Sequence, residues 1–389
     1  MTLCKLNLRH LRAVAEICER GSISAAAQAV NLTQPAVTQG IARTEALVGQ
    51  PLFDRTPDGM VPLSSAVTII PRIRAALDHV GSSRVTMAQV RAFIAFADSG
   101  SYAGASALSG ISQPSLHRAI NDLSVALRRP LLERRGKGLA LTEAGRRTVR
   151  GFRLARGELA AALAELAGIL GRETGQIVVG AMPLSRARIL PAAAAAFHAR
   201  HPEIAISIIE GSYAELAAPL RDGQIDVMIG ALRDPPPGPD LVQTALFEDR
   251  PVILGRRGHP MMRRISDMLH PDPQALLRML ADYDWIVSGP GTPLRAQWQG
   301  MFDAAGLVAP RVPIECGSVI TIREILTKTD FLTLLSPDQV SVELEAGWLD
   351  LICPAPRGIL RRIGVTTRAN WRPTILQQAF LNELQVQAL

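Results

Sequence analysis

The chain has 389 residues, 48% hydrophobic and 20% charged, which is enough to build two or three folded domains and too apolar for a disordered chain. No run of about 18 apolar residues offers a membrane span, and the first residues lack the apolar core of a secretory signal, so we expect a cytoplasmic protein without a membrane partner. The net charge of +7 is uneven: +3 over residues 1–85, +7 over 86–172 and −3 over 173–389. A basic N-terminal part favours a polyanionic partner.

The N-terminal part of the sequence contains an internal repeat. With a constant offset of 79 positions, several residues of one segment recur identically in the next. Gly21-Ser22 and Gln34-Pro35 recur as Gly100-Ser101 and Gln113-Pro114. Chance does not produce so long a register, so the pattern predicts two copies of one module in tandem.

Each copy opens with a pattern typical of three short helices. In the first copy, apolar residues recur at helical spacing over 8–18, and Gly21 follows where a helix end favours positive φ. Ser22 and Thr33 are candidate N-caps of the next two helices. Pro35 then falls in the first turn of the third helix, where no backbone hydrogen bond is lost.

A predicted β-hairpin follows the three helices of each copy. Two short strands around a turn are typical of the wing in a winged helix-turn-helix domain. We therefore expect one such domain over residues 1–66 and a second over 86–145. Residues 146–172 carry mixed three-, four- and seven-residue apolar spacing, which predicts a linker helix that dimerises. Pro71 interrupts the matching segment of the first copy, so residues 67–85 are expected to form a connector instead.

These motifs resemble the DNA-binding domain of the LysR-type transcriptional regulators. The string that carries the resemblance is Gly-Ser, an Ala-Ala pair, Gln-Pro-Ala-Val-Thr and Leu-Phe-Asp-Arg. In that family the helix that begins at the Ser/Thr-Gln-Pro segment enters the major groove, and the wing meets the DNA backbone. Gln can bond adenine, and Arg can bond guanine or phosphate. The resemblance therefore implies double-stranded DNA as a partner, contacted by Thr33, Gln34, Pro35, Thr38, Gln39, Arg55, Ser112, Gln113, Pro114, His117, Arg118, Arg134, Arg135 and Lys137.

Residues 173–389 predict an α/β body. Strand and helix signals alternate as β-α-β-α-β from residue 176, which favours a mostly parallel sheet. A second lobe is expected from about residue 285, with a strand in the region 322–335, a returning strand at 363–368 and a closing helix at 373–386. Several phrases in this part, including Gly258-His259-Pro260, resemble the family's effector-binding domain. The resemblance implies two α/β lobes with a periplasmic-binding-protein-like fold.

Ligands of such folds lie beyond the carboxyl ends of strands, where helix N-termini present free N–H groups. We therefore expect a small-molecule effector, of unknown identity, at Pro183, Leu184, Ser185, Gly211, Ser212, Gly291, Thr292, Gly317 and Ser318. Ser185 and Thr292 are the preferred contacts because each hydroxyl stands at an expected helix start. Either residue is equally compatible with a plain N-cap.

The sequence offers no catalytic or metal-binding motif. It lacks G-x-S-x-G, a P-loop, G-x-G-x-x-G and H-E-x-x-H, and its four cysteines are widely spaced, so no enzyme activity, metal or cofactor is expected. The preferred interpretation is a LysR-type transcription regulator that forms a homodimer or homotetramer. The alternative is a solute-binding or enzymatic α/β protein with accessory DNA-binding modules. The residues leave open whether both copies bind DNA or one has become a packing element.

Overall fold

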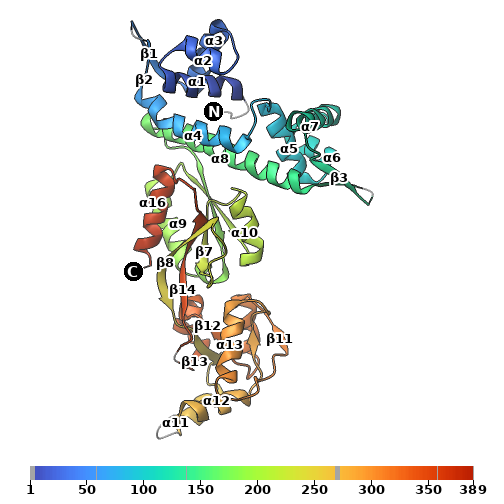
Figure 1. Cartoon of the computed structure of the whole chain (residues 1–389). Helices are drawn as coiled ribbons and strands as arrows, with labels where there is room; N and C mark the ends of the chain where they lie inside the picture. The colour runs from blue at the N-terminus through green and yellow to red at the C-terminus, as the bar shows by residue number, and fades with distance from the viewer. Residues whose placement is uncertain (1–4, 58, 137, 268–271, 357, 389) are drawn as a thin grey trace.

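The computed structural model describes residues 5–57, 59–136, 138–267, 272–356 and 358–388. The molecule is elongated, with the helical N-terminal part at one end and two α/β lobes following it (Figure 1). The first copy contains α1 (Leu8–Arg20), α2 (Ile23–Ala29), α3 (Gln34–Val48), β1 (Phe53–Thr56), β2 (Gly59–Pro62) and α4 (Ser64–Val80). The second copy contains α5 (Met87–Ser99), α6 (Tyr102–Ser109), α7 (Gln113–Leu127), β3 (Leu132–Arg135), β4 (Gly138–Leu141) and α8 (Glu143–Ile169).

Each element of the second copy begins 79 residues after its counterpart in the first, so the predicted repeat is confirmed. The same local chemistry builds both copies. Gly21 and Gly100 end the first helices at φ angles of 65° and 71°, in the region that favours glycine. The hydroxyls of Thr33 and Ser112 accept a hydrogen bond from a backbone N–H in the first turn of α3 and α7.

The expected connector is a helix. α4 runs without a break from Ser64 to Val80 although it contains Pro71. Pro71 lies on the exposed side of α4, whereas Ile69 and Ile73 are buried in the apolar core. The prediction was wrong because burial of this apolar face outweighs the single backbone hydrogen bond that proline removes.

Helices α4 and α8 lie side by side and join the two copies (Figure 1). One continuous apolar cluster contains Ile73 of α4, Phe152 and Leu159 of α8, and residues from both sets of short helices. α8 begins at Glu143, slightly before the expected linker segment. The apolar face that was expected to pair with a second chain is therefore covered by α4 of the same chain.

The first lobe is built around a five-stranded sheet with the order β6-β5-β7-β14-β8. Its elements are β5 (Gln176–Ala181), the 3-10 helix η2 (Pro183–Arg186), α9 (Ile189–Arg200), β6 (Ala205–Glu210), α10 (Tyr213–Arg221), β7 (Val227–Ala231), β8 (Leu241–Asp249), β14 (Arg361–Arg368) and α16 (Ile375–Val386). The β-α-β-α-β order, the returning strand and the closing helix are confirmed. The sheet is mixed, because β14 pairs antiparallel with both β7 and β8.

The second lobe lies between β8 and β14 in sequence. It contains β9 (Val252–Arg256), α11 (Pro260–Ser266), α12 (Pro273–Ala281), β10 (Ile286–Val287), α13 (Pro293–Asp303), β11 (Ile314–Glu315), α14 (Val319–Leu326), β12 (Thr333–Leu335), η3 (Pro337–Val340), α15 (Ser341–Glu345) and β13 (Leu349–Pro354). The lobe thus begins near residue 252, earlier than expected, because β9 is the centre of its sheet β12-β9-β13. The region 322–335 is helical in its first part, where Ser318 caps α14 and Ile322 and Leu326 form a buried helical face.

Candidate nucleic-acid interface and effector site

The first two turns of α3 and α7 present the predicted recognition residues. Gln34, Pro35 and Gln39 are exposed on α3, and Thr38 is half-buried between them. The opposite face of α3 is anchored in the core by Val37. On α7 the predicted residues Gln113, Pro114, His117 and Arg118 are exposed, and Leu116 supplies the buried anchor.

The two copies hold their recognition side chains differently. In the first copy, the Gln34 side-chain amide donates to the Ser24 hydroxyl at 3.0 Å, which ties α3 to α2. In the second copy, the His117 ring packs on Tyr102 with ring centroids 5.0 Å apart, and its Nδ1 lies 3.1 Å from the Asn121 side chain. The aromatic contact is a feature that motif comparison alone did not reveal.

Arginines surround these helices without carboxylate partners. Arg55 on β1, Arg118 on α7, and Arg134 and Arg135 on β3 are exposed, and none has a carboxylate within 4 Å among the residues that the structure describes. Their guanidinium groups can therefore neutralise phosphates without first breaking an ion pair. Lys137 lies outside the described residues.

The predicted effector residues of the first lobe follow two neighbouring parallel strands. Pro183, Leu184 and Ser185 form η2 after β5, and Gly211 and Ser212 follow β6. Ser185 is completely buried, and its hydroxyl donates to the Met182 carbonyl at 2.8 Å. It does not start a helix, because α9 begins only at Ile189. The expected helix-start position of Ser185 was wrong, since Pro183 starts a separate 3-10 turn there.

The predicted residues of the second lobe also gather at one sheet edge. Gly291 and Thr292 follow β10, and Gly317 and Ser318 follow its parallel neighbour β11. Thr292 and Ser318 are the N-caps of α13 and α14. The Thr292 hydroxyl also lies 2.7 Å from the hydroxyl of Ser288. These side chains have structural hydrogen bonds, and their exposed helix starts remain a candidate ligand surface.

Contacts between the lobes occur beside these residues. Arg188 of the first lobe forms an ion pair with Asp338 of the second at 3.3 Å. The pair borders a cavity of about 110 Å³, and of the nine predicted effector residues Leu184 lines it. Within each lobe the predicted residues therefore follow neighbouring parallel strands, and Leu184 is the predicted residue that lines this cavity between the lobes.

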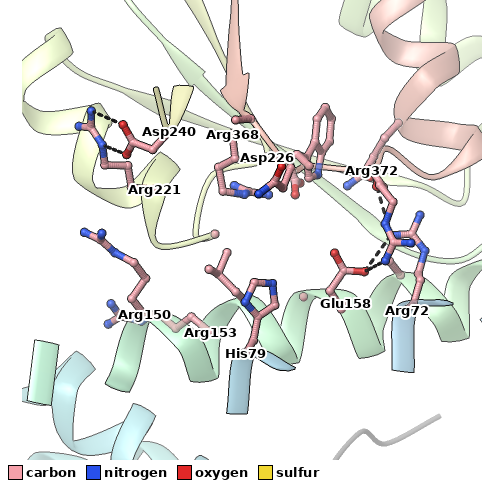
Figure 2. Close-up of a pocket in the computed structure, with 18 of the residues that line it drawn as sticks. Arg72, His79, Arg150, Arg153, Glu158, Arg221, Asp226, Asp240, Arg368 and Arg372 are labelled. Atoms are coloured by element: carbon pink, nitrogen blue, oxygen red, sulfur yellow. Dashed lines mark hydrogen bonds and ion pairs between the residues drawn. The ribbon is translucent and has the colours of Figure 1, made fainter. Parts of the chain in front are cut away.

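A larger cavity, which the sequence did not predict, lies where α4 and α8 meet the first lobe (Figure 2). This junction cavity has a volume of about 370 Å³, and six arginines line it. They come from both linker helices, from α10, and from β14 and the loop after it: Arg72, Arg150, Arg153, Arg221, Arg368 and Arg372. The residues are far apart in sequence, so no motif could have identified the cluster.

Two carboxylates tie the linker helices to the first lobe. Asp222, directly after α10, accepts hydrogen bonds from Arg150 at 2.7 Å and from Arg153 at 3.0 Å. Glu158 of α8 pairs with Arg72 at 3.2 Å and with Arg372 at 3.3 Å. Because these ion pairs are partly shielded from water, they hold the two parts together more strongly than exposed pairs would.

Asp226, another carboxyl group of the junction cavity, is not part of such a bridge. Asp226 is half-buried, and burial raises its pKa. The backbone N–H of Val178, at 2.8 Å, and the positive charge of Arg368 act in the opposite direction. Arg368 in turn donates to the carbonyl oxygens of Leu220 and Ile225, so it links β14 to the end of α10.

Two other kinds of feature are absent from the described residues. No group of three or more His, Cys, Asp and Glu side chains there is arranged to hold a metal ion. No helix in the same part of the chain is both long and apolar enough to span a membrane.

Comparison with known proteins identifies both parts of the chain. The model of the bacterial regulatory helix-turn-helix protein, lysR family, matches twice, at residues 8–66 and 87–146. The LysR substrate binding domain matches residues 170–388. The HTH-type transcriptional regulator GalR of Pseudomonas putida is 31% identical over 376 residues, which cover 93% of this chain and 92% of that protein.

Solved structures with lower sequence identity share the fold. A full-length variant of OxyR from Pseudomonas aeruginosa superposes with a TM-score of 0.57 at 20% identity, covering 78% of this chain and 98% of its own. Full-length CbnR in complex with its target DNA gives a TM-score of 0.52 at 17% identity, covering 77% and 98%. About a fifth of this chain therefore has no counterpart in these two structures.

Proposed function

The chain belongs to the LysR family of bacterial transcription regulators, and we propose that its helices α3 and α7 read operator DNA while its two lobes bind the effector. As a member of this family it binds double-stranded DNA and a small-molecule effector and forms homo-oligomers. One observation carries the assignment of the DNA contacts. Each of the two family helix-turn-helix segments presents an exposed Gln in the first turn of its third helix and at least one exposed arginine on its wing.

The proposed base contacts follow from the chemistry of these side chains. Gln34 and Gln113 can bond adenine through two hydrogen bonds, and Arg118 can bond guanine in the same way. Thr33 and Ser112 cap the helices that carry them, so their side chains also orient the first turn. The wing arginines contact phosphates, which positions the domain without reading sequence.

We place the effector between the lobes, next to the turns that follow β5, β6, β10 and β11. Two crossing strands, β8 and β14, link the lobes, and a buried ion pair between Asp249 and Arg361 joins their ends. Closure of the lobes around a ligand would bend the chain at this pair. The first lobe would pass the movement to α8 through the ion pairs of Asp222 with Arg150 and of Glu158 with Arg372. The protein would do this work in the bacterial cytoplasm, where the DNA is.

Footprinting of the two recognition residues tests this function. Genomic DNA fragments protected by the unaltered protein are compared with those protected by Gln34→Ala and Gln113→Ala. Loss of a bidentate base contact is expected to weaken binding by about 1–3 kcal/mol at the position that it reads. Gln385→Ala, at an exposed glutamine on α16 of the first lobe, is the matched control. Unchanged protection by both recognition variants would contradict the proposed contacts.

A further inference from the structure

The contact between α4 and α8, which we call the seam, has an internal symmetry. Arg72 of α4 pairs with Glu158 of α8 at 3.2 Å. Further along, His79 of α4 lies so close to Gly151 of α8 that a Cβ added to Gly151 would be 2.5 Å from the His79 carbonyl oxygen. The contact positions therefore advance along α4 as they go back along α8, so the two helices run antiparallel.

The internal repeat makes these two contacts equivalent to each other. With the offset of 79 positions, Arg72 is the counterpart of Gly151, and His79 is the counterpart of Glu158. When the two copies are exchanged, the contact of Arg72 with Glu158 becomes the contact of Gly151 with His79. This reciprocity is what defines an isologous, two-fold interface between identical subunits. The seam therefore has the geometry of a dimer interface, although both partners belong to one chain.

The packing around the seam follows the same symmetry. α1 packs on α4 in the first copy, and α5 packs on α8 in the second. The seam is fully covered: Arg72 is buried between Glu158 and Glu165, and Phe152 is buried in the apolar cluster that both copies share. The close approach at Gly151 leaves no space for a side chain, and so none for a helix of a second chain.

We propose that each chain forms its own two-headed DNA-reading unit, in which α3 and α7 read two unlike half-sites of one operator. The inference rests on the proposed function, because it assumes that both helices enter grooves. Homo-oligomers would then join complete units through surfaces outside the seam. A regulator whose seam forms between two chains pairs identical readers, whereas this seam pairs the first copy with the second.

The two readers differ in chemistry. At equivalent positions, Thr38 of α3 corresponds to His117 of α7, and Gln39 corresponds to Arg118. Among positions 34, 38 and 39 and their counterparts, only the glutamine in the first turn is common to both helices. The second reader adds an exposed guanidinium, which favours guanine, whereas the first offers an amide in its place, which favours adenine. The two half-sites should therefore share an adenine contact and differ beside it.

Selection from a random library of DNA duplexes tests the inference with the full-length protein. The expected product is a pair of unlike half-sites, centred about one helical turn apart or a multiple of it. Gln34→Ala should relax selection at one half-site, by roughly 5- to 150-fold in affinity for the preferred base, and Gln113→Ala at the other. Both glutamines are exposed, so these variants should fold, and their circular dichroism spectra verify it. Native mass spectrometry on the selected duplex should count one chain per pair of half-sites.

The outcomes separate the inference from the function on which it rests. An inverted repeat of identical half-sites, with two chains per pair and both halves relaxed by one variant, would overturn the single-chain unit while DNA reading stands. Selection of one isolated half-site would overturn it as well. If no sequence is enriched, or neither variant changes the selected sequence, the proposed function itself fails and the inference fails with it.

Discussion

At the scale of single residues, the least expected chemistry is a buried histidine in the second lobe. His259 is completely buried; its Nδ1 accepts a hydrogen bond from the backbone N–H of Met261 at 3.1 Å, and its Nε2 lies 3.0 Å from the carbonyl oxygen of Asp330. This arrangement suits the neutral ring with a proton on Nε2. Burial lowers the pKa of His259, while the nearby Asp330 acts to raise it and the charge of Arg256 to lower it further.

The sign of the resulting pH dependence follows directly. Because the pKa of His259 is lower in the folded state, the unfolded chain binds the proton first, and stability falls as the pH drops below about 6.5. We expect the melting temperature of the full-length protein to decrease between pH 7.5 and 5.5. His259→Asn should lower the melting temperature at pH 7.5 but make its drop between pH 7.5 and 5.5 smaller. Part of the drop should remain, because burial also lowers the pKa of His10. The exposed His198 supplies the control, His198→Asn. If the melting temperature of His259→Asn drops as much between these pH values as that of the unaltered protein, His259 is not the source of the pH dependence.

The effector residues show what a sequence can and cannot predict at this scale. Thr292 was predicted at a helix start and is found there, as the N-cap of α13. Ser185 was assigned to a helix start too, but its hydroxyl is buried in a 3-10 turn. Capping depends on neighbours in sequence, so it can be predicted from a motif. Exposure depends on what packs over the residue, and the sequence does not contain that information locally.

At the scale of elements, α4 shows how tertiary packing overrides a local signal. The interior Pro71 pointed to a connector, yet the helix is continuous. Replacing this proline should stabilise α4, because Pro71→Ala restores a backbone donor for the carbonyl of Val67 and removes a steric conflict with the preceding turn. The free energy of unfolding should rise by about 1–2 kcal/mol, since the greater conformational freedom of the unfolded Pro71→Ala chain offsets part of the gain. The hydrogen bond from Arg372 to the carbonyl of residue 71 uses the backbone and is retained.

Hydrogen exchange measures this effect locally. We expect amide exchange in α4 to slow by roughly tenfold in Pro71→Ala. Val67→Ala is the control, since Val67 is exposed on the same helix and its replacement changes helix propensity alone. Equal slowing in both variants would mean that the proline imposes no special cost.

At the scale of the whole molecule, the sequence predicted the parts better than their assembly. The repeat and the order of the first strands of the body followed from motifs and periodicity, and the two-lobed body followed from the family resemblance. The antiparallel seam and the junction cavity did not, because they depend on pairs such as Arg72 with Glu158, 86 positions apart, and Arg150 with Asp222, 72 apart. Charged residues of this kind look like solvated surface in a sequence, and only the fold shows which of them meet.

The ion pairs between the first lobe and α8 lead to a prediction about how the lobes and the DNA-reading unit are coupled. Asp222→Asn removes the charge that holds Arg150 and Arg153 of α8 to the end of α10. Hydrogen exchange should then rise several-fold in the N-terminal half of α8 and in the turn after α10, because the two parts lose a shared constraint. Asp240→Asn is a close control, since Asp240 lines the junction cavity together with Arg150 and Arg153 but pairs with Arg221 inside the first lobe. The faster exchange should be confined to Asp222→Asn, and the same increase in both variants would show that the cavity responds to loss of negative charge rather than to loss of the link between the lobe and α8.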